Sequence, residues 1–253
     1  MGIGDEIMAA GEARRLREKT GKAVIIVNRI NRPIWSEVWE GNPYILRSYP
    51  LIQGTYLRMV NAGGARPYIT GKTPERWTWK PYKPVPAQMF FTEAELARAR
   101  FAKGAVMLEP NVKDIGHTNK AWIWERWEEL AYRIRKELKL DTLQCLPAGA
   151  KALTHVRTLP TPRFRDAAAA LHEARAFVGT EGGLMHAAAA VQTPAVILWS
   201  EFISPEITGY DTLVNLRHAG KPCGLRTNCP GCKASMEAIT VDEVLESLKG
   251  ILK

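Results

Sequence analysis

The chain has 253 residues, 46% of them hydrophobic, which is enough for one large or two small packed domains and argues against a disordered chain. Its formal net charge of +9 attracts anions, whether nucleotides, nucleic acids or acidic membranes. No run approaches the roughly 18 apolar residues of a membrane span, no signal-peptide core occurs, and four cysteines are too few for a disulfide scaffold. We therefore expect a cytoplasmic protein without a transmembrane segment.

The first predicted elements are a helix over residues 6–19, which ends at Gly21, and a buried β-branched strand over residues 23–28. Short strands are expected at residues 44–46 and 56–60, within a segment rich in proline, tryptophan and tyrosine. Three prolines between residues 77 and 86 suit an extended connector. We therefore expect two domains, residues 1–95 and 96–253.

Strands and helices alternate in the second half of the chain. Strands are expected at residues 105–109, near 143, at 176–179 and at 195–199, and helices at 121–138, 164–173, 184–191 and 241–252. This alternation predicts an α/β fold with a doubly wound parallel sheet, which binds ligands beyond the carboxyl ends of its strands. The last helix follows a capping box at Thr240 and is left free to pack toward the N-terminal domain.

A glycine turn joins the strand at 176–179 to an alanine-rich helix. Its residues are Thr180, Glu181, Gly182, Gly183 and Leu184. Adjacent glycines let the backbone approach a ligand, and the first amides of a helix are unpaired donors at its positive end, so phosphate oxygens are natural occupants. The alternative is a turn that only lets the helix pack closely. Because the Glu181 carboxylate would repel a diphosphate, we expect it to accept sugar hydroxyls.

Three further side chains are candidates for the same site. His186, on the first turn of the alanine-rich helix, is either a structural hydrogen-bonding residue or a ligand of a phosphate or hydroxyl. Lys113 and Lys120 follow the strand at 105–109, where an ammonium would neutralise a diphosphate leaving group. Both lysines also fit ordinary surface positions.

A second glycine turn, Gly2 and Gly4 followed by Asp5, precedes the first helix. Asp5 is either the N-cap of that helix or a carboxylate that takes a proton from an attacking hydroxyl, with the glycines leaving room for an acceptor. A doubly wound domain would place a strand before this turn, so we expect that strand to be absent or replaced by another segment.

Four potential metal ligands lie near the C-terminus: His218, Cys223, Cys229 and Cys232. The C-x-x-C pair with two further soft ligands could close a tetrahedral zinc site. A redox pair and plain thiols remain alternatives.

Taken together, these motifs resemble the heptosyltransferase-like glycosyltransferases of family nine, which have the two-domain GT-B fold. The resemblance is carried by Gly2–Asp5 with Ala9, Ala10 and Leu16, by Glu109–Asn111 with Lys120–Trp122, by 178–188, and by Cys232, Met236, Ile239 and Val244. It covers nearly the full length and is densest in the C-terminal half. It implies two Rossmann-like domains, the N-terminal one reduced, so a lipid-linked acceptor does not follow.

The resemblance also implies an activity: inverting transfer of a sugar from a nucleotide-diphosphate sugar to a hydroxyl, with no cofactor and no catalytic metal. Asp5 would be the general base, Lys120 a donor-phosphate ligand, and the turn at Gly182 and Gly183 the diphosphate site. Glu181 occupies the place of a donor-contacting aspartate. Sugar, nucleotide base and acceptor stay open.

Two other functions remain open. A sugar-nucleotide epimerase of the same fold would need further acid-base residues in the cleft. A nucleic-acid-binding protein, or a transferase that modifies a DNA base or another polyanionic acceptor, would fit the positive charge. In that case Trp77 and Trp79 would stack bases, whereas the alternative is that they pack at the domain boundary.

Overall fold

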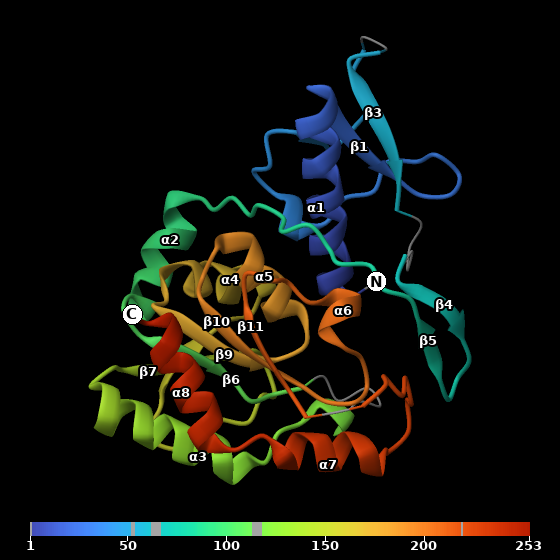
Figure 1. Ribbon diagram of the computed structural model, residues 1–253. Coiled ribbons are helices and arrows are strands. Elements are labelled where there is room, and N and C mark those ends of the chain that lie inside the picture. The colour runs from blue at the N-terminus through green and yellow to red at the C-terminus, as the bar shows by residue number, and fades with distance from the viewer. Residues whose placement is uncertain (1, 52–53, 62–66, 113–117, 219) are drawn as a thin grey trace.

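The computed structural model describes residues 2–51, 54–61, 67–112, 118–218 and 220–253. Figure 1 shows a small N-terminal sheet beside helix α1 (Ile3–Thr20) and a larger part built on a second sheet. Within the described part of the chain, no helix is long and apolar enough to cross a membrane.

The N-terminal sheet has the order β2-β1-β3 and is parallel throughout. Its strands are β1 (Ala23–Val27), β2 (Ile45–Leu46) and β3 (Tyr56–Val60), and the short helix η1 (Glu37–Trp39) lies between the first two. Gly21 ends α1 with a φ of 71°, a left-handed conformation that favours glycine. The predicted helix and three strands of this region are confirmed.

An antiparallel hairpin of β4 (Ile69–Lys72) and β5 (Trp77–Trp79) returns the chain toward the second part. The Trp77 amide donates to the Gly224 carbonyl at 2.9 Å. An extended segment then leads to α2 (Glu93–Ala99) and the short helix η2 (Arg100–Ala102). The hairpin therefore contacts a loop almost 150 residues further along the chain.

The larger sheet confirms the predicted α/β fold class. Its strands are β6 (Val106–Glu109), β7 (Thr142–Leu146), β8 (Arg157–Pro160), β9 (Ala176–Thr180), β10 (Ala195–Trp199) and β11 (Val214–Arg217). They are all parallel, in the order β11-β10-β9-β6-β7-β8. The strand order reverses between β6 and β9, and a crevice at the carboxyl ends of such strands is where this fold class binds ligands.

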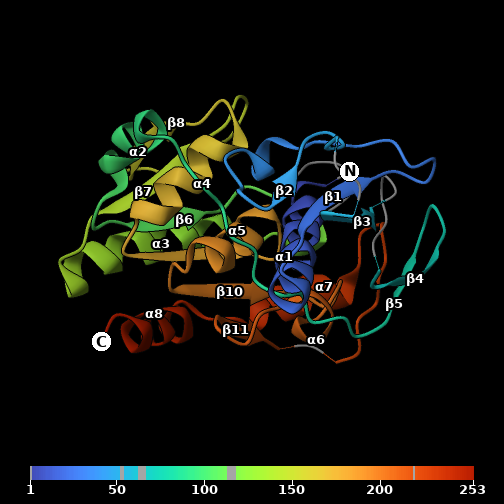
Figure 2. The same cartoon turned by 90° about the horizontal axis from the view of Figure 1, so that it is seen from above.

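Helices cover both faces of this sheet (Figure 2). They are η3 (Thr118–Lys120), α3 (Trp124–Arg133), which continues as a π-helical turn η4 (Ile134–Leu138), α4 (Phe164–Glu173), α5 (Gly183–Val191), α6 (Pro205–Thr208), α7 (Pro230–Ala238) and α8 (Val241–Ile251). Successive strand residues face opposite cores: Phe177 packs with α1, α4 and α5, whereas Val178 packs with α3 and α8. The last helix packs on the C-terminal sheet, against α3, β9 and β10.

One arginine joins the two parts. Arg165 in α4 is 2% exposed and donates to both carboxylate oxygens of Glu95, each at 2.8 Å. Its guanidinium also donates to the carbonyls of Glu37, at 3.0 Å, and Phe90, at 2.7 Å. Hydrogen bonding to this guanidinium holds the pKa of Glu95 down to about 2. Arg165 thus ties the N-terminal part, the connecting segment and α2 to the larger sheet.

Candidate active site

The two predicted glycine turns lie in direct contact. Gly4, in the first turn of α1, packs on the first turn of α5, so that a β-carbon on Gly4 would lie 2.6 Å from His186 Cδ2 and 3.7 Å from the Gly183 Cα. A β-carbon on Gly183 would in turn lie 3.1 Å from the Phe164 ring. A β-carbon on Gly4 would clash with His186, whereas one on Gly183 would need a small shift of Phe164. The close packing brings the positive ends of α1 and α5 together.

Asp5 lies at this junction. The N-cap of α1 is Gly2, and Asp5 is the third residue of the helix, so the alternative that Asp5 is the cap itself is wrong. Its Oδ2 accepts the Gly2 amide at 3.2 Å, and its Oδ1 accepts the Tyr68 hydroxyl at 2.7 Å. The residue is 7% exposed. Both hydrogen bonds fix the orientation of the carboxylate.

Asp5 also lines a pocket of about 290 Å³ at the end of β3. The other lining residues are Ala9, Met59, Val60, Asn61, Pro67 and Tyr82. The pocket therefore combines one carboxylate with an amide, a phenol and an apolar wall, and it is large enough for part of a small polar molecule. Gly2 and Gly4 belong to the same turn as Asp5.

The second turn has the features of an anion site. Thr180 ends β9 and is 8% exposed, and α5 begins at Gly183 after the extended Gly182. The first intrahelical bond of α5 runs from the His186 amide to the Gly182 carbonyl at 3.4 Å. The amides of Gly183, Leu184 and the next residue precede that bond, so helix geometry leaves them without an intrahelical acceptor.

Lys120 and Glu181 form an ion pair beside this turn. Their side chains are only 19% and 11% exposed, and Lys120 Nζ lies 5.0 Å from the centre of the Phe202 ring. The structure thus places Lys120 at the predicted donor site and gives Glu181 a cationic partner. Lys113, the other candidate lysine, lies outside the described residues.

His186 is 3% exposed, and its Nδ1 lies 2.9 Å from the Tyr210 hydroxyl. Burial lowers the pKa of His186 to about 4, so the imidazole is neutral near pH 7. The carboxylates of Glu181 and Asp5 oppose this shift and the Lys120 ammonium adds to it. The charged groups of both turns therefore act on one buried ring.

Glu109 is a titratable group that sequence reasoning treated only as a landmark. It ends β6 next to Gly179 of β9, at the point where the strand order reverses. Burial raises the pKa of Glu109 to about 8, although its Oε1 accepts the Asn111 amide at 2.9 Å. At neutral pH this carboxyl is therefore mostly protonated and uncharged. The sequence signal that could have identified this group is a glutamate at the carboxyl end of a buried strand.

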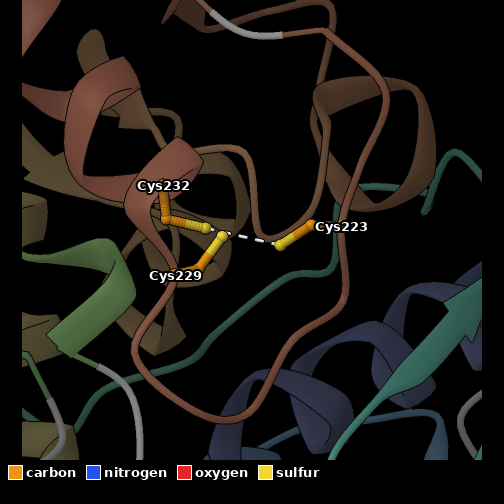
Figure 3. A group of neighbouring side chains, drawn as sticks. All are labelled: Cys223, Cys229 and Cys232. Atoms are coloured by element: carbon orange, nitrogen blue, oxygen red, sulfur yellow. Dashed lines mark hydrogen bonds between the residues drawn. The ribbon is translucent and has the colours of Figure 1, made fainter.

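Three of the four predicted metal ligands come together. The Sγ atoms of Cys223, Cys229 and Cys232 lie within 4.8 Å of one another, and Cys223 and Cys232 are 3.4 Å apart (Figure 3). Pairing with the Cys232 thiol lowers the pKa of Cys223. His218 does not join them, because its Nε2 bonds Glu243 Oε1 at 2.7 Å at the start of α8. We call Cys223, Cys229 and Cys232 the thiol cluster.

The aromatic stretch of β5 packs at the junction of the two parts. The Trp79 indole donates to the Phe202 carbonyl at 3.2 Å, and the rings of Trp77 and Trp79 lie 6.4 and 5.4 Å from the Phe202 ring. Lys72 and Arg226 lie over Trp77. These contacts match the packing interpretation of the two tryptophans.

A comparison with known protein families covers part of this site. The family model described as Glycosyltransferase family 9 (heptosyltransferase) matches residues 80–216, a range that includes Lys120, Glu181 and His186. Asp5 and the thiol cluster lie outside it. Among curated proteins, no sequence matches the chain.

Solved structures share the fold at low identity. The glycosyl transferase family 9 protein of Veillonella parvula DSM 2008 has a TM-score of 0.68 and 12% identity, covering 100% of this chain and 95% of that one. The iron-containing dodecameric glycosyltransferase TibC of enterotoxigenic E. coli H10407 has a TM-score of 0.59 and 15% identity, with 99% and 73% covered. E. coli ADP-heptose lps heptosyltransferase II has a TM-score of 0.52 and 20% identity, with 71% of this chain covered. The match spans 55% of the heptosyltransferase II chain.

Proposed function

This chain belongs to glycosyltransferase family 9, the heptosyltransferase family, as its motifs predicted, and we propose from that premise that it moves a sugar from a nucleotide-diphosphate sugar to a hydroxyl acceptor. Residues 1–95 would hold the acceptor and residues 96–253 the donor. One observation carries the proposal: the contact between Gly4 and the first turn of α5, which sets a carboxylate pocket beside an anion site.

The reaction follows from this placement. Asp5 takes the proton of an acceptor hydroxyl in its pocket, and the hydroxyl oxygen attacks the anomeric carbon. The bond from that carbon to the diphosphate oxygen breaks on the opposite face, so the anomeric configuration inverts. The leaving diphosphate is stabilised by the amides of Gly183 and Leu184 and by Lys120. These amides and the Lys120 ammonium already supply positive potential at the leaving diphosphate. We therefore propose that the transfer needs neither a metal nor a cofactor.

Lys120 and Glu181 would bind different parts of the donor, the diphosphate and the sugar or ribose hydroxyls. A diphosphate at the start of α5 competes with Glu181 for the Lys120 ammonium, and its two negative charges favour that exchange. The Glu181 carboxylate, released from the ion pair, can then accept hydroxyls of the sugar or ribose. His186, held neutral by burial, can donate a hydrogen bond without repelling Lys120.

The acceptor side is basic. Residues 41–74, which border the Asp5 pocket through Met59–Asn61 and Pro67, contain no aspartate or glutamate. A polyanionic acceptor, a charged glycan or a nucleic acid, is therefore our proposal for this side. Salt-sensitive retention on heparin and DNA, with none on a neutral glycan, is expected; equal retention on all three would contradict a polyanionic acceptor.

The experiment for the donor is a thermal-shift screen of nucleoside diphosphates and their sugars. ADP-heptose is the first compound to test, because a protein of similar fold is described as an ADP-heptose heptosyltransferase. A ligand at a hundred times its Kd adds roughly 2.7 kcal/mol of stability. We expect one nucleotide to raise Tm and its sugar to be consumed with release of nucleoside diphosphate. Conversion of the sugar with no such release would favour an epimerase instead.

A further inference from the structure

The thiol cluster lies on the loop that precedes α7 and on the first turn of that helix, a segment that the transfer reaction does not use. Cys229 and Cys232 are 8% and 0% exposed, and Cys223 is partly buried. The Leu225 amide donates to Cys223 Sγ at 3.4 Å, so the backbone already turns a donor toward this sulfur. Free thiols behave as small apolar side chains, and a thiol–thiol contact adds little stability. Packing alone therefore does not explain why three thiols lie this close together.

The separations fit a tetrahedral metal. Zinc binds cysteine sulfur at about 2.3 Å, so two sulfurs on one tetrahedral ion lie about 3.8 Å apart. The observed separation of 3.4 Å between Cys223 and Cys232, with Cys229 within 4.8 Å of both, brackets that value. We propose that the thiol cluster binds one thiolate-preferring divalent cation, Zn²⁺ or Fe²⁺, as a structural site.

The fourth ligand of this proposal is Glu201, whose carboxylate does not lie within 4.8 Å of all three sulfurs and would move toward them when the cation binds. Its carboxylate fills the space where a side chain on Gly231 would stand, and Cys229 Sγ lies 3.8 Å from the same point. This requirement explains the glycine inside the Cys229–Cys232 pair. Within the described ranges, the partly buried Glu201 carboxylate has no hydrogen bond or ion pair. A carboxylate without a partner beside three thiols is the donor set expected of a cation site.

The site is tied to the donor lysine through Asn119. The Asn119 side chain, 5% exposed, donates to the carbonyls of Leu225 at 2.9 Å and Thr227 at 2.8 Å. Its Oδ1 accepts the Cys229 amide at 3.0 Å. These three hydrogen bonds of the amide group all go to the segment that carries the thiols. Since Lys120 follows Asn119 directly, ordering of this segment also fixes the backbone position of Lys120.

A second path runs through the residue after Glu201. The amides of Cys223 and Gly224 donate to the carbonyls of Glu201 at 2.7 Å and Phe202 at 3.0 Å. The ring of Phe202 lies under Lys120 Nζ. A cation that fixes Cys223 therefore also fixes the surface on which the Lys120 ammonium rests. Asn119 and Phe202 act here as positioning residues; their role at the donor site rests on the proposed function, whereas the metal site does not.

Metal content is the direct test. Protein purified without chelator or a metal-affinity tag is analysed for zinc and iron by mass spectrometry, with an expected content of about one ion per chain. Cys232→Ser and Cys229→Ser should lower it at least about tenfold. Cys145→Ser is the matched control, because Cys145 is buried in β7 beside Met107, away from the cluster, and should leave the content unchanged. Wild-type protein without metal would overturn the site.

The wild-type protein provides a second test if the serine variants do not fold. After removal of the metal, addition of Co²⁺ should produce the visible bands of a tetrahedral thiolate complex, and Zn²⁺ should protect three of the four thiols from a thiol reagent. Equal reactivity with and without Zn²⁺ would overturn the proposal. Glu201→Gln should weaken zinc affinity at least about tenfold; unchanged affinity would remove Glu201 from the ligand set.

Amide hydrogen exchange tests the link to Lys120 without relying on activity. Removal of the metal should speed exchange at residues 223–232 and also at Asn119–Lys120, with no change in β7. Faster exchange in the loop alone would contradict the positioning of Lys120 while leaving the metal site in place.

Discussion

Gly4 packs so closely on His186 that no β-carbon fits between them. This contact fixes the first turn of α1 against the first turn of α5 and so sets Asp5 beside the helix terminus that Lys120 flanks. The proposed mechanism depends on this separation, because the hydroxyl activated by Asp5 must reach a sugar whose diphosphate is held at Gly183.

Gly4→Ala tests the contact. The added methyl group would lie 2.6 Å from His186 Cδ2, and His186 is held by Tyr210, so α1 must move away from α5. We expect turnover to fall at least about tenfold and stability to drop by about 1 to 3 kcal/mol. Gly250→Ala is the control, because a β-carbon there meets nothing within 4 Å. Normal turnover in Gly4→Ala would show that the juxtaposition is not needed.

Lys120→Ala should weaken nucleoside diphosphate binding about 10- to 100-fold, since a charge-assisted bond contributes about 1.5 to 3 kcal/mol. The substitution also leaves Glu181 without its cation. The double variant Lys120→Ala with Glu181→Gln should therefore recover stability but not affinity. Calorimetry measures the affinity and urea denaturation the stability; an unchanged affinity in Lys120→Ala would exclude a phosphate contact.

Glu109→Gln predicts a pH effect. The folded-state pKa of Glu109, about 8, lies above its ordinary value of 4.5, so its stabilising contribution is complete below pH 4.5 and is lost as the pH rises through 8. Glutamine does not titrate and can still accept the Asn111 amide. The variant should therefore gain on the order of 1 to 3 kcal/mol over wild type between pH 5 and pH 9. Denaturation curves at both pH values that differ by a constant amount would contradict a buried neutral carboxyl.

Sequence patterns identified the elements with buried, periodic apolar residues, such as α4 and β10. They missed β8 and β11 because both are edge strands whose residues are half exposed, and β8 ends in proline. They also missed α7, whose cysteines and glycine read as a ligand motif rather than a helix.

The two glycine turns could be recognised in the sequence because a few adjacent residues define them, while the roles of Asp5 and Lys120 stay predictions. Tyr68, Tyr210 and Asn119 could not be predicted, since each acts through a partner far away in the sequence. His218 shows the converse error: its spacing from the cysteines suggested a ligand, but the fold pairs it with Glu243.

Arg165→Met should destabilise the protein by about 3 to 5 kcal/mol, because the buried carboxylate of Glu95 loses its two-point partner and keeps the weaker contacts of Arg163, at 3.6 Å, and Thr92. Arg163→Met removes a half-exposed arginine from the same helix end and should cost at most about 1 kcal/mol. Adding Glu95→Gln to Arg165→Met should recover part of the loss. Equal stability of the two arginine variants in urea would show that Arg165 does not lock the two parts together.

The central claim is that Asp5 is the base of the transfer reaction. Asp5→Asn keeps the shape of the side chain and can still accept the Tyr68 hydroxyl, but it cannot take a proton. With the donor sugar found by the thermal-shift screen, nucleoside diphosphate release and nucleotide affinity are measured on wild type and variant. We predict a loss of release of at least about 100-fold, with affinity within about threefold of wild type. Near-normal release by Asp5→Asn would contradict the account.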